Sequence, residues 1–309
     1  MGIHILGTGS YLPETVVENE AFSAIVDTSD EWIVKHSGIH RRHFQNGPTY
    51  EMAVKAGTAA LEAASLTPDQ IDLILCTTVS GDYDTPAMAC VVQGLLGAKN
   101  AVAFDINAAC AGFLYGTKTA HALLADAPRP YAIVVGAEVI SRVLDHTDRN
   151  TCVLFGDGAG AAVIARDDSA RWHTVFGSRG DSKSIWVQGP GPEKSAVHME
   201  GKAVFRFATE VVEGSIRQLV AAEECQVNDL DLVVCHQANA RIIDFVAKRL
   251  KAREGLFYKN MEHYGNTSAA SIPMALDELV EKGLLKPGMR VLTVGFGGGL
   301  TWAGALFTW

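Results

Sequence analysis

An internal repeat constrains this sequence more than any other feature. Residues 68–76 combine a turn-forming start with a buried apolar run, and residues 227–235 repeat the pattern almost position by position. Later strand-like runs also correspond, residues 132–136 in the first half and 291–295 in the second. The period is far longer than that of a solenoid. The sequence therefore predicts two similar units built from one kind of α/β fold.

The helices flanking the repeat support this division of the chain. Each copy follows a segment of helical composition, residues 49–64 and residues 204–224. Strands that alternate with helices are typical of α/β folds with parallel strands. We expect halves at residues 1–168 and 169–309, packed about a pseudo-twofold axis so that loops from equivalent positions meet between them.

Composition excludes several classes of protein. The 309 residues are 48% hydrophobic and 20% charged, as in an ordinary globular protein, and a net charge of -9 argues against a nucleic-acid partner. The six cysteines form no Cys-x-x-Cys pairs, which indicates a reducing compartment. No apolar run has membrane-spanning length, and the first residues lack the basic start of a signal peptide. We expect a cytoplasmic protein with no membrane contact.

The stretch 101–117 carries the first candidate for chemistry. A strand-like run, residues 101–106, passes through small residues into a segment of helical type that continues to about Leu124, and Cys110 lies at the junction. The unpaired N–H groups of a helix N-terminus favour a thiolate, so this position predicts a lowered pKa and a sulfur nucleophile. The alternative is a buried, inert cysteine that packs as a small hydrophobe.

The second half supplies two partners for Cys110. His236 ends the repeated strand, and Asn266 occupies roughly the position in the second half that Cys110 holds in the first. Taken alone, His236 is more simply explained as a structural histidine and Asn266 as a turn residue. The duplication predicts that all three side chains meet in one pocket. A metal site at Cys235, His236 and His263 is disfavoured, because neighbours on a strand point to opposite faces.

Other local patterns give further expectations. Residues 151–155 resemble a strand, and the glycine run 156–160 matches a dinucleotide-binding pattern in its letters. Because β-branched residues resume at once, we predict a hairpin with positive φ at its turn and no nucleotide cofactor. Residues 166–200, including the Gly-Pro run 189–192, read mostly as loop. Thr28 or Ser29 is expected to cap a short helix.

Taken together, the motifs resemble the β-ketoacyl-[acyl-carrier-protein] synthase III family of the thiolase superfamily, over essentially the whole chain. The similar segments are residues 27–32, 108–113, 155–161, 235–239, 263–270 and 296–299. The resemblance implies a five-layered α-β-α-β-α fold, a homodimer, and decarboxylative condensation of an acyl-CoA primer with malonyl-acyl carrier protein. No metal or redox cofactor is implied; coenzyme A enters as the substrate thioester.

The resemblance also assigns roles to residues. Cys110 would attack the acyl-CoA thioester, and the backbone N–H groups of Cys110 and Gly298 would hold the oxyanion. His236 and Asn266 would donate hydrogen bonds to the enolate that loss of CO2 creates.

Substrate-binding positions carry over in the same way. Trp32 and Arg149 match a pair that sandwiches the adenine of coenzyme A, with Thr28 nearby and Asn239 facing the pantetheine. Residues 239–253 are expected to form one helical stretch, and they include five basic residues and one acidic residue. This excess of positive charge predicts a docking patch for the acidic carrier protein. The basic residues are Arg241, Lys248, Arg249, Lys251 and Arg253. The simpler interpretation is a solvated surface.

Two positions depart from the family pattern. Thr85 stands where acetyl-specific members carry a phenylalanine contributed across the dimer, which predicts a longer acyl tunnel and a primer longer than acetyl. His36 replaces an arginine near the coenzyme A phosphates, which puts tight coenzyme A binding in question.

Other functions remain open from the sequence. A degradative thiolase would need a second cysteine where Phe296 precedes Gly297. A synthase of secondary metabolism, of the polyketide or quinolone type, would share the same Cys-His-Asn set. A cysteine-dependent acyl-CoA thioesterase and a non-catalytic coenzyme A-binding protein are the remaining alternatives.

Overall fold

The computed structural model describes residues 2–189 and 196–309, and its strands form two large sheets of five strands each. The first sheet has the spatial order β1 (Gly2–Tyr11), β7 (Gly158–Asp167), β6 (Tyr131–Glu138), β4 (Leu73–Thr77) and β5 (Val102–Ile106). The second has the order β8 (Trp172–Asp181), β14 (Gly299–Thr308), β13 (Arg290–Gly297), β11 (Leu232–Cys235) and β12 (Phe257–Tyr258).

The two sheets share one topology, which confirms the predicted duplication. In the first, β4 is parallel to β5 and β6, and β7 is antiparallel to β6 and β1. In the second, β11 is parallel to β12 and β13, and β14 is antiparallel to β13 and β8. The first sheet takes all its strands from before residue 168 and the second all its strands from after it. The exact domain limits stay a prediction.

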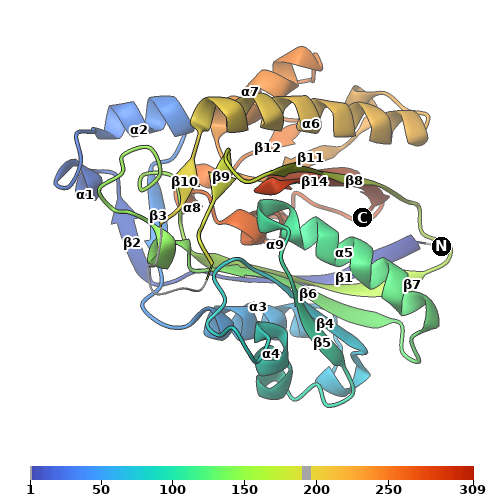
Figure 1. Cartoon of the computed structure of the whole chain (residues 1–309). Coiled ribbons are helices and arrows are strands. Elements are labelled where there is room, and N and C mark those ends of the chain that lie inside the picture. The colour runs from blue at the N-terminus through green and yellow to red at the C-terminus, as the bar shows by residue number, and fades with distance from the viewer. Residues whose placement is uncertain (1, 190–195) are drawn as a thin grey trace.

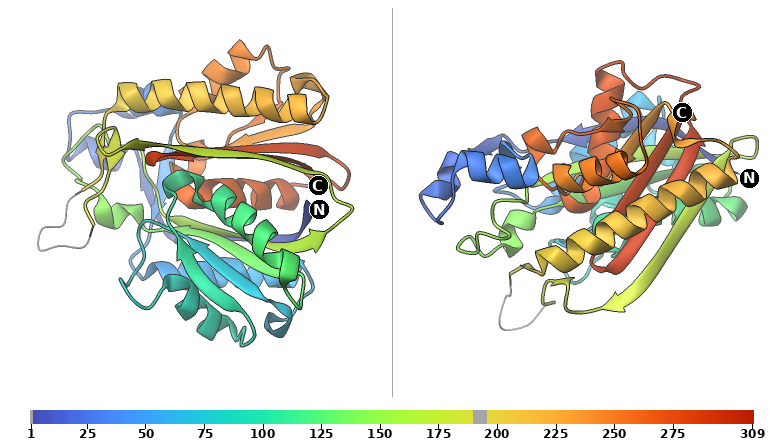
Figure 2. Two further views of the ribbon diagram at one scale, coloured as in Figure 1. Left: turned by 45° about the vertical axis from the view of Figure 1, so that its right-hand side comes forward. Right: turned by 90° about the horizontal axis from the view of Figure 1, so that it is seen from above.

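Helices complete five layers (Figures 1 and 2). The helices α3 (Thr49–Ala63) and α4 (Met88–Leu96) cover the outer face of the first sheet, α5 (Gly112–Leu123) and α9 (Ser271–Glu281) lie between the sheets, and α6 (Gly201–Ala222) and α7 (Ala240–Arg249) cover the second. Shorter elements are β2 (Thr15–Glu18), β3 (Arg41–Phe44), β9 (Ile185–Trp186), β10 (His198–Met199), α1 (Glu20–Ser23), α2 (Asp30–Ser37) and α8 (Met261–Tyr264). The predicted α-β-α-β-α fold is confirmed.

The central layer joins the two halves. One apolar cluster contains Leu75 and Val134 of the first sheet, Val234 and Val291 of the second, and side chains such as Phe113 from the helices between them. A helix with a sheet on each side is buried on both faces, and α9 is buried along almost its whole length. This shared core fixes the ends of the two sheets relative to each other, where loops of both halves meet.

The glycine run after residue 155 differs from its prediction. Residues 151–155 form turns rather than a strand, apart from a single bridge between Phe155 and Asn266. The glycines lead directly into β7, and none of them has positive φ. They permit close packing instead, since a Cβ at Gly160 would lie 2.6 Å from the backbone nitrogen of Met274 in α9.

The expectation of loop over residues 166–200 is also wrong in part. Residues 172–181 form β8, the edge strand that pairs antiparallel with β14. Its residues are half-buried or exposed, so the sequence lacks the clean alternation that identifies a strand. Within the predicted Gly-Pro loop, residues 190–192 lie outside the described residues.

The expected helix cap is present at the start of α2. The Ser29 hydroxyl accepts a hydrogen bond from the backbone N–H of Trp32 at 3.2 Å. This bond satisfies one of the free N–H groups of the first turn and fixes where Trp32 lies. Within the described ranges, no helix is both long enough and apolar enough to cross a membrane.

The packing of α9 on β7 gives a stability prediction. Gly160→Ala forces a methyl group against the backbone of α9, so we expect a loss of about 1–3 kcal/mol in the free energy of unfolding. Gly214→Ala is the matched control, because it lies inside α6 with open space around it and should stabilise by up to about 1 kcal/mol. Urea unfolding of both variants measures this; equal effects would contradict the close packing.

Candidate active site

Cys110 lies at a strained turn between β5 and α5. It belongs to a 3-10 turn, Ala109–Ala111, and Ala109 has φ of 47°, in the left-handed region that non-glycine residues rarely adopt. Such strain is typical of functional turns, where the surrounding structure holds it in place. The thiol is only 8% exposed and sits just before the N-terminus of α5, as the sequence predicted.

The predicted lowering of the Cys110 pKa is wrong for the free protein. Burial raises the pKa of the thiol to about 12, and the negative charge of Glu138 adds to this; a hydrogen bond with Ser268 acts in the opposite direction. The sequence showed the helix N-terminus but not the depth of burial. In the resting protein Cys110 is therefore a thiol.

Two glycines of the second half lie against Cys110. A Cβ at Gly297 would be 2.6 Å from the Cys110 nitrogen, and one at Gly298 would be 3.7 Å from the Ala109 Cβ. The Thr301 hydroxyl of β14 bonds to the carbonyl oxygens of both Gly298, at 3.0 Å, and Ala108, at 2.8 Å. The structure thus brings Gly298, the predicted second oxyanion donor, next to the nucleophile turn.

His236 follows β11 and is almost completely buried. Its Nδ1 is 2.7 Å from the Ser271 hydroxyl, which also accepts the Gln237 N–H at 3.3 Å. Because the Ser271 oxygen accepts the Gln237 N–H, the Ser271 hydroxyl can donate its proton to Nδ1 of His236. Nδ1 is then the acceptor, so a neutral imidazole carries its single N–H at Nε2. Burial lowers the pKa of His236 to about 3. The imidazole is a neutral hydrogen-bond donor across the physiological pH range.

Asn266 lies in a tight turn after α8, and backbone bonds hold it at both sides. Its N–H donates to Leu154 at 2.8 Å, and its carbonyl accepts from Gly156 at 3.1 Å. The side-chain oxygen accepts the backbone N–H of Ser268 at 2.9 Å. Since the oxygen is engaged, the NH2 group is the end of the amide that can donate to a substrate.

Shared neighbours connect the three residues. Ser268 contacts Cys110 by its side chain and Asn266 by its backbone. The strand β13 contacts the other pair: its Gly297 lies against Cys110, while Val294 accepts the His236 N–H at 2.7 Å and Phe296 packs against the imidazole. Cys110, His236 and Asn266 therefore lie in one region where the two halves meet, although they share neighbours rather than direct contacts.

Sequence reasoning missed three polar residues around this point. Ser271 orients His236, and Ser268 donates to a fully buried carboxylate, Glu138. Ser268 and Ser271 lie in or beside a turn rich in Ser and Ala, which reads as an ordinary helix start. Glu138 ends an apolar strand, and a carboxylate in that position is a signal that could have been used.

The expected coenzyme A residues lie together on the surface. The Arg149 guanidinium stacks on the Trp32 ring at 4.7 Å, and the His36 ring stacks on Trp32 at 4.3 Å. The Thr28 hydroxyl is buried without a partner among the described residues. A purine sandwiched between the Trp32 ring and the Arg149 guanidinium needs these two groups to be about 7 Å apart, which is twice the van der Waals separation. They now stack directly on each other, so Arg149 must move before a purine can bind there.

Asn239 has a structural role that the sequence did not reveal. Its Oδ1 accepts the Arg241 N–H and caps α7, while its Nδ2 donates to the His36 carbonyl at 2.9 Å. Both ends of the amide thus join α7 to α2. The side chain explains how two binding elements are held together, and its contact with pantetheine stays a prediction.

Thr85 is exposed, in the loop between β4 and α4. The Asp105 carboxylate of β5 accepts the N–H groups of Met88 and Ala89, which fixes the start of α4 beside β5. Thr85 therefore lies near the free edge of the first sheet. Within one chain it is not brought to Cys110.

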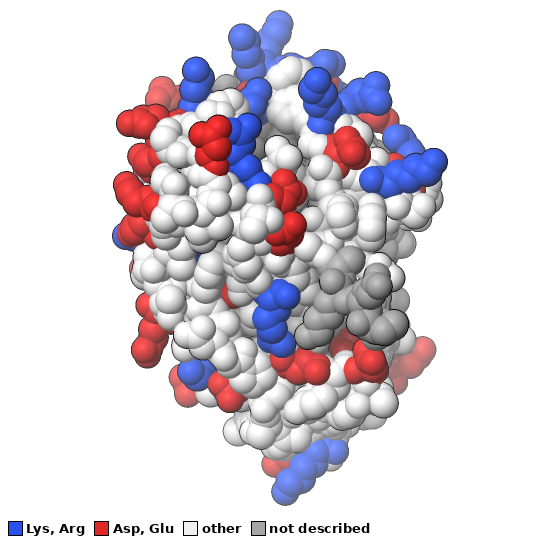
Figure 3. All heavy atoms as spheres, turned by 60° about the vertical axis from the view of Figure 1, so that its left-hand side comes forward, with Lys and Arg blue, Asp and Glu red and all other residues white. Residues whose placement is uncertain are grey.

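The basic residues of the predicted docking patch divide into three groups. The helix α7 ends at Arg249, so Lys251 and Arg253 lie beyond it, and the expected single helical stretch over residues 239–253 is wrong. Arg253 donates to the carbonyl oxygens of Leu230 and Asp231. Arg241 and Lys248 are exposed on α7, and Lys and Arg side chains gather at the top of the molecule, where α7 and α6 lie (Figure 3).

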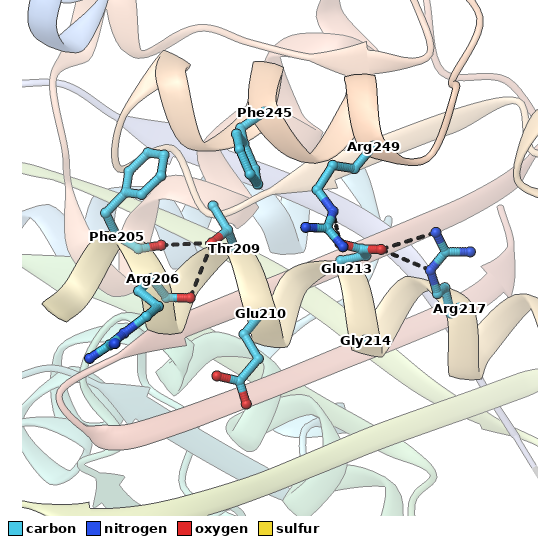
Figure 4. A pocket seen from close by; sticks show the side chains of 9 residues that line it. All are labelled: Phe205, Arg206, Thr209, Glu210, Glu213, Gly214, Arg217, Phe245 and Arg249. Carbon is cyan, nitrogen blue, oxygen red and sulfur yellow. Dashed lines mark hydrogen bonds and ion pairs between the residues drawn. The ribbon is translucent and has the colours of Figure 1, made fainter. Parts of the chain in front are cut away.

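Arg249 is paired rather than free. A groove of about 530 Å³ lies between α6 and α7, and in it Arg249 and Arg217 both point toward Glu213, at 2.7 and 3.0 Å (Figure 4). Phe205 and Phe245 face each other across the groove at 5.8 Å. The charge count along residues 239–253 missed Glu213, because it comes from another helix.

Comparison with known proteins covers both halves. Residues 104–180 match the family model described as 3-oxoacyl-[acyl-carrier-protein (ACP)] synthase III, and residues 220–309 match the model of its C-terminal part. A β-ketoacyl-[acyl-carrier-protein] synthase III of Clostridium acetobutylicum is 44% identical over 320 aligned residues, covering 99% of this chain and 98% of the relative.

Solved structures agree. The 3-oxoacyl-[acyl-carrier-protein] synthase III of Aquifex aeolicus superposes with a TM-score of 0.94 at 38% identity, with full coverage of both chains. The priming β-ketosynthase of the R1128 polyketide pathway also reaches 0.94, at 36% identity, covering 99% of this chain and 96% of that one. The chain therefore belongs to the β-ketoacyl-[acyl-carrier-protein] synthase III family of condensing acyltransferases.

Proposed function

We propose that the protein condenses an acyl-CoA primer with malonyl-acyl carrier protein through an acyl-Cys110 intermediate, with release of CO2, to form a 3-ketoacyl-acyl carrier protein for fatty acid synthesis. One observation carries this: a buried cysteine at a strained turn of one half shares neighbours with an imidazole and an amide of the other half, and both of these are held as neutral donors. The family relationship supports the overall reaction, and the residues supply its steps.

In the first step, Cys110 sulfur forms a bond to the thioester carbon. The N–H groups of Cys110 and Gly298 stabilise the oxyanion, coenzyme A leaves as its thiol with the proton that Cys110 gives up, and an acyl-enzyme remains. The close contact of Gly297 with Cys110 supports this arrangement, because only glycine lets the two backbones approach so closely.

In the second step, the malonyl thioester loses CO2 and becomes an enolate. His236 Nε2 and the Asn266 NH2 group donate to its oxygen, and the enolate carbon attacks the acyl-Cys110 carbonyl and expels the sulfur. A neutral donor suits this step, since the low pKa of His236 keeps the imidazole uncharged. Loss of CO2 produces the carbanion, so no residue needs to remove a proton from carbon.

A primer longer than acetyl is supported by an apolar region beside the site. Ile140, Leu144, Phe155 and Val197 form a small cluster of their own, and Phe155 bridges to Asn266. Thr85 is small and lies near the edge strand β5, whose Val102 is 63% exposed. We propose that a second copy pairs at this edge, so that Thr85 of one chain leaves room at the end of the acyl tunnel of the other.

The primer prediction is tested by intact-protein mass spectrometry after incubation with a mixture of acyl-CoAs. We expect a covalent adduct on wild-type protein with a medium-chain acyl group in preference to acetyl, and none on Cys110→Ala. Thr85→Phe should shift the preference toward acetyl, because the larger ring shortens the tunnel. Preference of the wild-type protein for acetyl-CoA would contradict the longer tunnel, and free acid without a ketoacyl product would identify a thioesterase.

The two donors give a separate prediction. His236→Ala and Asn266→Ala should each reduce malonyl decarboxylation by a factor on the order of 10²–10³, while Cys110 still becomes acylated. Because the pKa of His236 is about 3, the wild-type decarboxylation rate should show no histidine inflection between pH 5 and pH 8. Release of radiolabelled CO2 measures this step. If both variants lost acylation of Cys110 as strongly as decarboxylation, the separate role of the two donors in decarboxylation would be contradicted.

Carrier-protein docking is proposed for the exposed face of α7. Arg241 and Lys248 lie on this helix, and the groove beside them offers Phe245, which is 41% exposed, as an apolar contact. An acidic helix of the carrier protein would find unpaired positive charge at these two residues rather than at Arg249.

The docking prediction compares three charge-reversal variants, one of them a double variant. The double variant R241E/K248E should raise KM for malonyl-acyl carrier protein roughly tenfold, about 1.4 kcal/mol, and reduce its salt dependence. The same variant should leave KM for malonyl-CoA unchanged, and Lys99→Glu, an exposed site after α4, serves as the control. A larger effect from Arg249→Glu than from the double variant would place docking in the groove instead.

A further inference from the structure

A fully buried arginine that the condensation steps do not use lies against the Asn266 turn. Arg42 belongs to β3, which pairs with β2 and contacts α8, the short helix that ends just before Gly265 (Figure 1). Among the described residues, Arg42 is the largest side chain that is fully buried. A buried charge is costly unless hydrogen bonds satisfy it, so its partners are informative.

The guanidinium bonds to two other segments of the first half. Nη1 donates to Asn19 Oδ1 at 2.8 Å and to the Val17 carbonyl at 3.3 Å, and Nη2 donates to the Val153 carbonyl at 2.5 Å. The Phe22 ring packs on the group, with its centre 4.5 Å from the guanidinium carbon. Burial lowers the pKa of Arg42 to about 10, so the group is still charged at neutral pH. Because hydrogen bonds from a charged donor are stronger than those between neutral groups, Val153 is held firmly.

The segment that follows Val153 carries the Asn266 turn. The Leu154 carbonyl accepts the Asn266 N–H at 2.8 Å, and the Gly156 N–H donates to the Asn266 carbonyl at 3.1 Å. Both backbone groups of Asn266 are therefore bonded to residues close in sequence to the carbonyl that Arg42 binds.

The stem of Arg42 packs directly on the same turn. A Cβ at Gly156 would lie 2.9 Å from the Arg42 Cβ, and a Cβ at Gly265, where φ is 67°, would lie 3.1 Å from it. Glycine at both positions allows this close approach. One side chain thus fixes the turn by its stem and the bonding partner of the turn by its guanidinium.

The other two residues of the proposed site are held by different contacts. Cys110 lies against Gly297, and His236 is bonded to Ser271 and to the Val294 carbonyl. Within the described ranges, the hydrogen bonds of Arg42 reach neither Cys110 nor His236.

We propose that Arg42 is a positioning residue for Asn266: it fixes the segment 153–156 and thereby aims the Asn266 amide at the enolate oxygen, without acting on the acylation of Cys110. This inference rests on the proposed function, in which Asn266 is an enolate donor. Donors at an active site must be held within about 0.5 Å of their productive positions, so a small displacement of the turn lowers the decarboxylation rate.

Arg42→Lys is the test variant. Lysine keeps the positive charge and the start of the stem, but its single ammonium group cannot replace two nitrogens that reach acceptors on different segments. We expect release of radiolabelled CO2 from malonyl-CoA to fall about tenfold or more. The rate of Cys110 acylation by acyl-CoA, measured by intact-protein mass spectrometry, should change less than about twofold.

Arg129→Lys is the matched control. Arg129 pairs with Asp72 at the end of the first sheet where β4 and β6 begin, whereas Cys110 follows the opposite end of the neighbouring β5. Both rates should stay within about twofold of the wild type. Phe22→Leu is a milder second variant if Arg42→Lys does not fold. It removes the ring that packs on the guanidinium, so it should lower decarboxylation by a smaller factor.

A double-mutant cycle shows whether Arg42 acts through Asn266. Without the amide its orientation no longer matters, so in the Asn266→Ala background Arg42→Lys should change decarboxylation less than about twofold. Hydrogen exchange gives a readout that needs no reaction. The peptide that contains Gly156, whose N–H bonds to Asn266, should exchange faster in Arg42→Lys, while peptides of α6 should not change.

The outcomes separate this inference from the proposed function. Equal losses of acylation and decarboxylation in Arg42→Lys, together with a lower melting temperature, would identify a merely structural role and overturn the inference. Unchanged decarboxylation in both Arg42→Lys and Phe22→Leu, or effects that multiply in the double variant, would overturn it too. If the wild-type protein releases no CO2 from malonyl-CoA, the proposed function fails, and hydrogen exchange alone then decides whether Arg42 holds the turn.

Discussion

The structure depends on a close backbone contact between its two halves. Gly295 and Gly297 of β13 lie against Ala111 and Cys110 of the other half, where any side chain on Gly297 would collide with the Cys110 nitrogen. The contact is maintained by the helices between the sheets, which form one core with both. The proposed nucleophile and the proposed oxyanion donor are thereby placed by the packing of the whole molecule rather than by a local loop.

Burial determines the chemistry that this junction can perform. It raises the pKa of Cys110 and lowers the pKa of His236, so the free site contains a thiol and a neutral imidazole rather than an ion pair. A thiol and a neutral imidazole receive an uncharged acyl thioester without separating a buried ion pair. In the proposed reaction, the charge that develops on the oxyanion and the enolate meets backbone N–H groups and the two side-chain donors, which can stabilise it.

The sequence predicted what the duplication determines and missed what depends on contacts between residues that are distant in the sequence. Cys110, His236 and Asn266 could be placed together because equivalent loops of repeated units must meet. The strand β8 could not be identified, since none of its residues is fully buried and its sequence therefore lacks a regular apolar pattern. The pairing of Arg249 with Glu213 and the bond from Asn239 to the His36 carbonyl were hidden because each needs a partner that is distant in the sequence.

The duplication extends to the active-site turns themselves, with a register that differs from the one expected. Ala109 and Ser268 both have positive φ, and each donates its N–H to the side-chain oxygen of the asparagine two residues earlier, Asn107 and Asn266. Asn266 is thus equivalent to Asn107, and Cys110 to Ala269. The same register pairs Gly112, which faces Thr77, with Ser271, which orients His236. One type of turn therefore accounts for both sites. The sulfur of Cys110 corresponds to the methyl group of Ala269. The contact of Gly112 with Thr77 corresponds to the contact of Ser271 with His236. The two halves thus share the backbone of this turn and differ in its side chains, so that one supplies the proposed nucleophile and the other the proposed donors.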